Sequence, residues 1–313
     1  MKNEGINTEV SAGKANLKYR QSSRMKKRQT SGLMRKIFLL FTALFALATA
    51  AGADTYTVTT TADSGAGSLR QAITDANALG VSATINFAIT GEIPYVINLS
   101  TPLPPVNVPT AIDGYTQSGS IKPGATWPAK IMVQLQGNET GNGLEFTTAA
   151  AGSSVKGLSV VGFGNDVDHA GIYIAAPNVT VAGNLIGLKI DGTALANSIG
   201  VLCGGADNVV VGGATPDCRN VISGNTYEGV TFIPVGDNLD NFASGELVQN
   251  NYVGTNVYGT EAIGNGTHGV DFDGANNSSI LDNVIGGNGQ YGIGCDATYS
   301  TSSTIPKIHD VTI

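Results

Sequence analysis

Gly229-Val230-Thr231-Phe232 is one copy of a four-residue string that recurs from residue 143 onward in this 313-residue chain: glycine, apolar, variable, apolar. Side chains alternate between the two faces of a β-strand, so both apolar members of a copy point one way and the variable member points the other. Each copy therefore predicts one half-buried strand whose third residue faces outward. The six copies begin at Gly143, Gly171, Gly200, Gly229, Gly269 and Gly292.

The spacing of these copies predicts a solenoid. Their starts lie 28, 29, 29, 40 and 23 residues apart, which is too far for hairpins and typical of one supersecondary unit that is stacked repeatedly. Longer strings repeat as well. Asn184-Leu185-Ile186-Gly187 returns as Asn251-Tyr252-Val253-Gly254 after 67 residues, and Asn220-Val221-Ile222-Ser223-Gly224-Asn225 returns as Asn283-Val284-Ile285-Gly286-Gly287-Asn288 after 63. The true period is therefore a pair of coils joined by variable loops.

Asparagine recurs at fixed places in these longer strings. Asparagine tolerates left-handed turns, and stacked amides can hydrogen-bond from one layer to the next. We therefore interpret Asn184, Asn225, Asn251 and Asn288 as structural residues.

Composition and charge narrow the function classes. The chain has 42 glycines and only 13% charged residues, which favours short strands and tight turns over helices. After Ala53 it carries seven Lys and Arg against 22 Asp and Glu, a net charge of about −15. Such a surface repels phosphate backbones and anionic lipid, so we expect no nucleic-acid partner. Cations and neutral or basic ligands fit better.

The first 53 residues predict export. Residues 1–53 hold a basic extension and then the apolar run 37–50, followed by Ala51-Gly52-Ala53. A cationic start, an apolar stretch of this length and a small-residue ending are typical of a secretory signal peptide, here residues 34–53; an uncleaved anchor is the alternative. Because Met34 opens a compact signal by itself, we expect residues 1–33 to come from an upstream start site. No second apolar span follows, so we expect no transmembrane segment in the mature visible chain.

Residues 54–83 predict a cap for the solenoid. The alternating stretch 55–61 predicts a strand, and Ser68 with Gln71 predicts a reciprocal capping box at the start of a helix. Leu69, Ala72, Ile73, Ala76 and Leu79 fall on one face of that helix. An apolar helix face here can cover the open end of the first coil. Residues 84–313 form the solenoid proper, which we expect to continue beyond Ile313.

These motifs resemble a known family. Residues 56–73, beginning Tyr56-Thr57-Val58-Thr59, resemble the N-terminal capping segment of bacterial exported right-handed parallel β-helix proteins, which share the pectate-lyase-like fold. Ala111-Ile112-Asp113-Gly114-Tyr115-Thr116-Gln117, Val155-Lys156-Gly157-Leu158 and the Asn-Val-Ile-Ser-Gly-Asn string resemble their repeats, so the similarity covers about residues 55–313. The resemblance implies an all-β, right-handed parallel β-helix with a short N-terminal capping strand and an amphipathic helix. It leaves function open, because the fold hosts polysaccharide lyases, glycoside hydrolases, tailspikes and adhesins.

Acidic residues occupy outward positions near the end of the chain. Asp271 stands at an exposed third position, Asp273 follows it, and Asp296 takes the position of Asp273 in the next copy. Two carboxylates one layer apart can share a hard cation, so Asp273 and Asp296 are the predicted calcium ligands. Outward acidic residues are also what an acidic exported protein carries by default.

A second group of candidates lies in a turn before a strand. Asp166, Asp168 and His169 precede the Gly171 copy, and His268 holds a similar place before Gly269. Imidazole and carboxyl groups can act as general acids and bases, although a turn histidine is more simply solvated. The catalytic candidates are therefore Asp271, Asp273, Asp166, Asp168, His169 and His268.

We compare these candidates with the residues that glycan-cleaving enzymes require. A glycoside hydrolase needs two carboxyl groups roughly 5–9.5 Å apart, which Asp271, Asp273, Asp296 and Glu228 could supply. The chain lacks the Asn-Thr-Asp, Gly-Asp-Asp and Gly-His-Gly strings of the polygalacturonase-like branch. A pectate-type lyase resembles a calcium site with an Arg or Lys base, and no base here sits in a lyase-like string.

The three cysteines have a structural interpretation. Cys203 and Cys295 stand at the inward end of their strings and predict buried side chains. Cys218 lies in a loop from which it could reach Cys203 to form a disulfide. No Cys and His spacing predicts zinc.

The sequence therefore predicts a secreted or cell-surface β-helix, a monomeric rod that binds a polysaccharide or a host or matrix glycan, as an adhesin does. The alternatives are a polysaccharide lyase or glycoside hydrolase and a structural spacer. No further cofactor is expected.

Overall fold

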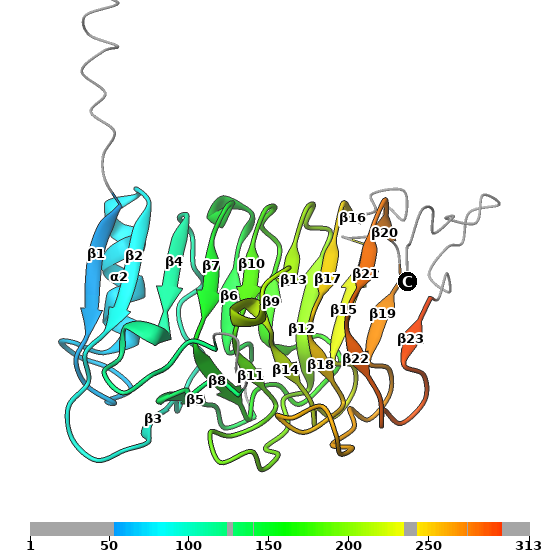
Figure 1. Cartoon of the computed structure of the whole chain (residues 1–313). Helices are drawn as coiled ribbons and strands as arrows, with labels where there is room; N and C mark the ends of the chain where they lie inside the picture. Colours follow the sequence, from blue (N-terminus) through cyan, green and yellow to red (C-terminus); the bar gives the residue numbers. More distant parts are fainter. Residues whose placement is uncertain (1–52, 124–127, 140, 235–242, 274, 296–313) are drawn as a thin grey trace, which may run out of the picture. The chain divides into compact units, whose positions relative to one another are not determined.

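Strands from the recurring string stack in parallel in the computed structural model of this chain, which describes residues 53–123, 128–139, 141–234, 243–273 and 275–295 (Figure 1). All of these residues belong to one compact unit, residues 53–313. Their strands form three principal sheets, here called A, B and C, and the predicted signal peptide lies almost wholly outside the described residues.

Each sheet is a stack of strands in chain order. In the described part, sheet A holds β1 (Asp54–Val58), β2 (Ala83–Phe87), β4 (Thr110–Asp113), β7 (Ser154–Lys156), β10 (Thr180–Ala182), β13 (Val210–Gly212), β17 (Leu247–Gln249) and β21 (Ser279–Leu281). Sheet B holds β3 (Tyr95–Asn98), β5 (Val133–Gln136), β8 (Leu158–Val161), β11 (Leu185–Ile186), β14 (Val221–Ile222), β18 (Tyr252–Val253) and β22 (Val284–Ile285). Sheet C holds β6 (Leu144–Phe146), β9 (Ala170–Ile174), β12 (Ile199–Gly204), β15 (Val230–Ile233), β19 (Val270–Phe272) and β23 (Ile293–Gly294).

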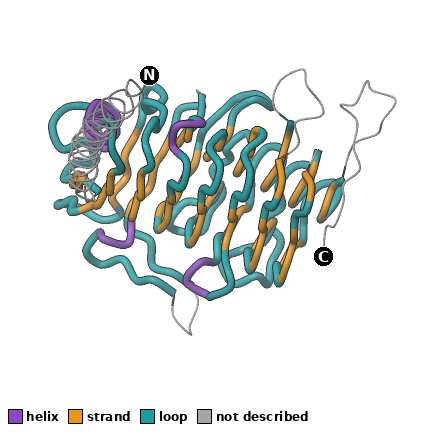
Figure 2. Tube along the Cα trace, turned by 90° about the horizontal axis from the view of Figure 1, so that it is seen from above, coloured by secondary structure: helices purple, strands orange, loops and turns teal. Residues whose placement is uncertain are grey.

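The chain passes through the three sheets in turn, and successive coils stack on one another (Figure 2). The strands β7, β8 and β9 make one coil, and β10, β11 and β12 make the next. The strands of neighbouring coils pair in parallel, for example β12 with β9 and with β15. Short elements join them: a small sheet of β16 (Ala243–Ser244) and β20 (Ala275–Asn276), and 3₁₀ turns at Gly114–Thr116, Thr148–Ala150 and Pro216–Cys218. This is the parallel β-helix that the sequence predicted.

Apolar side chains of successive coils stack inside the solenoid. Cys203 pairs with Ile174 on one side and with Phe232 on the other, and each is fully buried. The rings of Phe232 and Phe272 stack with their centroids 4.8 Å apart and their planes 7° from parallel. Burying one such side chain contributes about 1.5–3 kcal/mol, so the column that the string predicted is a main source of stability.

Two files of asparagines, each a ladder of stacked side chains with one residue per coil, run along the solenoid beside this core. In one, Asn184 Nδ2 donates to Asn220 Oδ1 at 3.1 Å, and Asn220 Nδ2 donates to Asn251 Oδ1 at 2.9 Å. The same oxygens accept backbone N–H groups of the preceding coil, as Asn220 Oδ1 does from Asn184 N at 2.9 Å. The files consist of Asn184, Asn220, Asn251 and Asn283, and of Asn197, Asn225, Asn265 and Asn288. The structural role predicted for Asn184, Asn225, Asn251 and Asn288 is confirmed.

The N-terminal cap is a strand and the helix α2 (Leu69–Leu79). The Ser68 hydroxyl accepts from Gln71 N at 3.1 Å, but the Gln71 side chain donates to Asp75 Oδ1 at 2.7 Å and does not return to Ser68. Only half of the predicted capping box therefore forms. Leu69, Ala72, Ile73 and Ala76 are buried as expected. The predicted burial of Leu79 is wrong: it is 54% exposed, at the helix end, where Gly80 turns the chain away.

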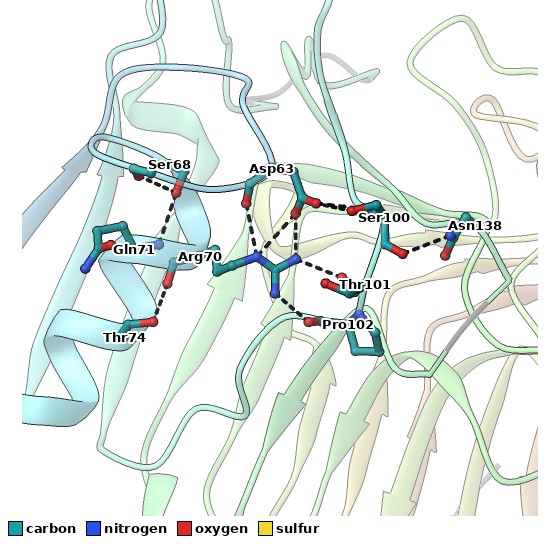
Figure 3. A network of polar contacts seen from close by, with 10 residues as sticks. Asp63, Ser68, Arg70, Gln71, Thr74, Ser100, Thr101, Pro102 and Asn138 are labelled. Atoms are coloured by element: carbon teal, nitrogen blue, oxygen red, sulfur yellow. Dashed lines mark hydrogen bonds and ion pairs between the residues drawn. The ribbon is translucent and has the colours of Figure 1, made fainter.

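Arg70 ties this helix to the first coil (Figure 3). Its guanidinium contacts Asp63 Oδ1 at 2.5 Å and donates to the carbonyls of Thr101 and Pro102 at 2.8 and 2.6 Å. Asp63 also accepts from Ser100. Burial by itself raises the pKa of Asp63, but the hydrogen bonds from Ser100 and Arg70 outweigh it, so the pKa lies below its ordinary value.

Loops of the chain itself cover the outside of sheet B. Antiparallel bridges between Leu188 and Ala194 and between Thr255 and Ala262 close two such loops, which are the longer repeats seen in the sequence. They help to form a second apolar cluster outside the main core, built on Ile131, Leu185, Leu188 and Val221 with Tyr252, Val257 and Ile263 packed against it. A ligand that approached sheet B from outside would therefore contact these loops and not the strands of the sheet.

The cysteines depart from the predictions in two ways. Cys203 is buried as expected, but Cys203 and Cys218 are both free thiols, so the predicted disulfide is absent. Cys295 is exposed rather than buried, because β23 is the last described strand of sheet C and no described layer covers the residue that follows it. Among the described residues, no helix is long and apolar enough to cross a membrane.

Candidate functional site

The outward face of sheet C carries the residues that the sequence singled out. Tyr173, Leu202, Thr231, Asp271 and Gly294 pair in register from β9 to β23 and occupy the variable third position of the string. A second row of side chains lies beside this one, just before the strands begin. It includes Glu228, His268 and Tyr291, each two residues before a member of the paired set Val230, Val270 and Ile293. Because the strands are in register, these side chains meet across coils although 23 to 40 residues separate them in the sequence.

A cavity of about 310 Å³ opens on this face. Carboxyl groups contribute one part of its lining and apolar side chains the other. The lining consists of Val167, Asp168, Ile199, Leu202, Glu228, Thr231, Ile233, Pro234, Asp271 and Asp273. These residues come from β12, β15 and β19, from positions next to β15 and β19, and from the turn before β9, so the cavity extends along the solenoid over several coils.

Glu228, His268 and Asp271 form the tightest group at the cavity. One ligand atom of each lies within 4.8 Å of the others. His268 Nδ1 is 3.2 Å from Asp271 Oδ2, and Thr267 Oγ1 donates to Glu228 Oε1 at 2.7 Å, which holds that carboxyl group in place. Among the described residues, this group could hold a metal ion, with one imidazole nitrogen and two carboxylates as donors.

Neighbouring residues fix this group. The His268 ring stacks on Tyr291 with centroids 5.4 Å apart and planes 12° from parallel. Gly294 is the residue paired with Asp271 in the next coil, and a side chain at Gly294 would collide with the Asp271 carboxyl group. The glycine therefore provides the space into which Asp271 extends.

The other part of the face is apolar and aromatic. Ala170, Ile199 and Leu202 are buried in a cluster of their own, and Tyr173, Tyr227 and Ile233 pack against it. Burial raises the pKa of the Tyr173 hydroxyl, helped by Glu145 and Cys203, so this phenol stays neutral and can donate a hydrogen bond. A pocket that joins an apolar wall to a few convergent polar groups is the usual form of a ligand site.

The structure brings together most of the predicted site residues. Asp271, Asp273 and Asp168 line the cavity, and His268 contacts Asp271. Asp271 faces outward as expected, but the expectation that it is exposed is wrong: it is 5% exposed, because His268 and the next coil at Gly294 cover it.

Asp166 and His169 are occupied with each other at the edge of this face. Their Oδ1 and Nδ1 atoms are 2.5 Å apart, and this contact lowers the pKa of Asp166. Neither lines the cavity. Asp296, one of the two predicted calcium ligands, lies outside the described residues, so that pairing with Asp273 stays a prediction.

The apolar wall of the cavity is less evident from the sequence. Tyr173 and Leu202 stand at the same third position as Asp271, so the register contained the signal. Ile199 and Val167 lie outside the string, and only the folded loop and strand bring them to the cavity.

One further carboxyl group is buried away from this face. Glu246 is 1% exposed and precedes β17 in sheet A, in a register position where the preceding coil has the buried Val209. Its Oε2 accepts from Ser278, and burial raises the pKa of Glu246 to about 7. This group belongs to the core and not to the cavity.

Known proteins give no direct guide to the function of this face. No protein-family model matches the chain, and no curated protein matches it by sequence.

Proposed function

We propose that this chain is an exported parallel β-helix protein that binds an extended glycan on the outward face of sheet C. The cavity that joins Leu202 and Ile199 to Asp168, Glu228, Asp271 and Asp273 carries the proposal. A sugar ring has apolar faces and a rim of hydroxyl donors, so it needs an apolar surface next to hydrogen-bond acceptors. This face offers both over successive coils, which suits a polymer.

The position of the cavity supports an extended ligand. Neighbouring layers of a parallel sheet stand about 4.8 Å apart, so a chain lying along the solenoid meets a new set of outward residues at each coil. Sheet B cannot offer this, because the loops closed at Leu188–Ala194 and Thr255–Ala262 cover it. Export and a place at the cell surface rest on the signal-like residues 34–53.

Glycoside hydrolysis is the second candidate, favoured by one observation. Glu228, His268 and Asp271 present two carboxyl groups and an imidazole within 4.8 Å of one another. A hydrolase needs a proton donor and a nucleophile or base on a pair of carboxyl groups, and this close spacing is nearer to that of retaining enzymes than to the roughly 6.5–9.5 Å of inverting ones. A pectate-type lyase finds less support, since no described Lys or Arg lines the cavity.

One panel experiment separates these functions. The full chain is offered neutral, acidic and amino-bearing polysaccharides, and each is scored for retention and for new reducing or unsaturated ends. Retention without new ends supports binding, and reducing ends support hydrolysis. Absence of both from every polysaccharide would overturn the proposal and favour a structural spacer.

The variants Ile233→Ala and Glu228→Gln test where the ligand binds. Ile233 lines the apolar part of the cavity and is only partly buried, and Glu228 lines the acidic part. We expect Ile233→Ala to weaken retention several-fold and Glu228→Gln to weaken it by about tenfold or more. Retention that is unchanged in both would place the ligand elsewhere on the solenoid.

A further inference from the structure

The buried Glu246 stands in a file of the core whose neighbouring members are uncharged. β17 pairs with β13 in the preceding coil and with β21 in the next, so Glu246, the residue before β17, stacks between Val209 and Ser278. Val209 and Ser278 are fully buried, and Glu246 is 1% exposed. A carboxyl group therefore takes an inward place that a valine fills one coil earlier.

The contacts of Glu246 leave part of its carboxyl group unsatisfied. Ser278 Oγ donates to Oε2, whereas Oε1 is buried and accepts no hydrogen bond from the described residues. Within the described part of the chain, no Lys, Arg or His forms an ion pair with Glu246. A buried charge without a cation or a full set of hydrogen bonds is strongly unfavourable. The closed structure therefore suits the protonated group.

The titratable groups that face Glu246 do not offset a negative charge. Burial is the largest cause that raises the pKa of Glu246 to about 7, and the Asp207 charge, in the turn before β13, adds to it against the hydrogen bond from Ser278. Cys203 at the end of β12 is the other titratable neighbour, and burial and Glu246 raise the pKa of its thiol. From the next coil, the described neighbour is the uncharged Ser278 hydroxyl.

The corner of the solenoid beside Glu246, residues 243–246 and 275–278, is held by few hydrogen bonds. β16 and β20 pair over only two residues each (Figure 1). Asn277 Nδ2 donates to Ser244 Oγ at 3.2 Å, and Asn208 N donates to the Ser244 carbonyl at 2.9 Å. Segments with so few contacts open locally at a small part of the cost of global unfolding. Opening this corner admits water to Glu246 while sheets A, B and C stay paired.

We infer that Glu246 is a pH-sensitive latch of this corner. While its carboxyl group carries a proton, the corner stays closed against the core. When the group ionises, the corner opens locally and water solvates the anion. The latch does not depend on the proposed glycan binding.

Hydrogen exchange of the full chain at pH 5 and pH 8, normalised for the intrinsic effect of pH on amide exchange, tests the latch. We expect residues 243–249 and 275–281 to lose protection by about tenfold or more at pH 8, because each unit of pKa shift is a factor of ten in the opening equilibrium. The strands β2, β4 and β7 should change little. No loss at the corner, or an equal loss in all of these strands, would overturn the inference.

Labelling of Cys203 gives a second readout. Its thiol is fully buried, whereas Cys218 and Cys295 are partly or fully accessible and serve as internal references. With a maleimide at pH 8, Cys203 should react about tenfold more slowly in Glu246→Gln than in the wild-type chain, and Cys218 should react equally in both. Equal rates at Cys203 in the two proteins would contradict the latch.

Two substitutions at Glu246 and one control complete the test. Glu246→Gln keeps the shape without the titration, and Glu246→Val installs the residue type found one coil earlier, so a poorly folding amide still leaves a variant to measure. Both should abolish the pH-dependent opening. Glu261→Gln removes the same charge from an exposed loop and should keep it. Opening that persists in both Glu246 variants, or disappears in the control, would overturn the inference.

Discussion

His268 Nδ1 lies 3.2 Å from Asp271 Oδ2 on the outward face of sheet C, where His268 precedes β19 and Asp271 is its central residue. The contact joins residues that the sequence selected for different reasons, a turn histidine and a third-position carboxylate. Glu228 of the preceding coil completes the group. The acidic part of the cavity is thus a product of register between coils.

The first prediction concerns this group. Glu228→Gln and Asp271→Asn remove charge with little change of shape, and each should weaken glycan retention by about tenfold or more, because a hydrogen bond to a charged group contributes about 1.5–3 kcal/mol. Affinity electrophoresis measures the effect. Glu145→Gln is the matched control: Glu145 is an outward residue of sheet C on β6 but does not line the cavity. Equal weakening by the control would show that overall charge, and not this group, controls retention.

The second prediction concerns the buried Glu246. Because burial raises its pKa to about 7, the folded state holds a proton that the unfolded chain releases above its ordinary value of 4.5. The contribution of Glu246 to the free energy of unfolding is therefore complete below about pH 4.5 and is lost as the pH rises to about 7. Above that pH it no longer changes. The loss amounts to about 3 kcal/mol.

Glu246→Gln should remove this dependence, since the amide does not titrate. Thermal unfolding at pH 5 and at pH 8 measures it: the wild-type chain should lose more stability than the variant over this interval. Parallel changes of Tm in the two proteins would show that Glu246 does not ionise within the core.

The third prediction concerns the asparagine files. Asn220 donates to Asn251 and to the Val181 carbonyl, and its oxygen accepts from Asn184. Asn220→Ala leaves these buried groups without partners, so it should cost about 2–4 kcal/mol. Asn98→Ala, on an exposed position of β3, should stay within about 0.5 kcal/mol. Similar Tm values for both variants would argue against a stabilising role of the files.

Much of this fold can be predicted from the sequence because the four-residue string recurs at each coil. The alternation in Gly229-Val230-Thr231-Phe232 places Val230 and Phe232 in the core, as found, because a single strand decides which face each side chain takes. Repeated asparagines likewise predict stacked amides. Both signals are local and recur at each coil.

The site is less readable because it depends on contacts between coils. The string identifies Asp271 as outward, yet its burial depends on His268 and on the absence of a side chain at Gly294. Cys295 shows the opposite case: its inward register position does not bury it, because no described strand lies beyond β23. Burial requires neighbours that a single repeat does not contain.

The fourth prediction concerns the cap. Arg70→Ala removes the contacts to Asp63, Thr101 and Pro102 and should destabilise the protein by about 1–3 kcal/mol. Lys130→Ala at an exposed loop position is the control. Since the pKa of Asp63 is lowered in the folded state, its contribution is complete above the ordinary value of 3.8 and is lost as the pH falls below it. A penalty for Arg70→Ala that stays constant down to pH 2 would contradict this coupling.

The most direct test of glycan binding on sheet C is hydrogen-exchange mass spectrometry of the full chain with and without the oligosaccharide that the panel retains most tightly. The account predicts slower exchange in the turn at residues 164–169 and in the segments 198–204, 227–234 and 267–273, which surround the cavity. Protection confined to the outward positions of sheet A, such as β7 and β10, or to the loops over sheet B would contradict it.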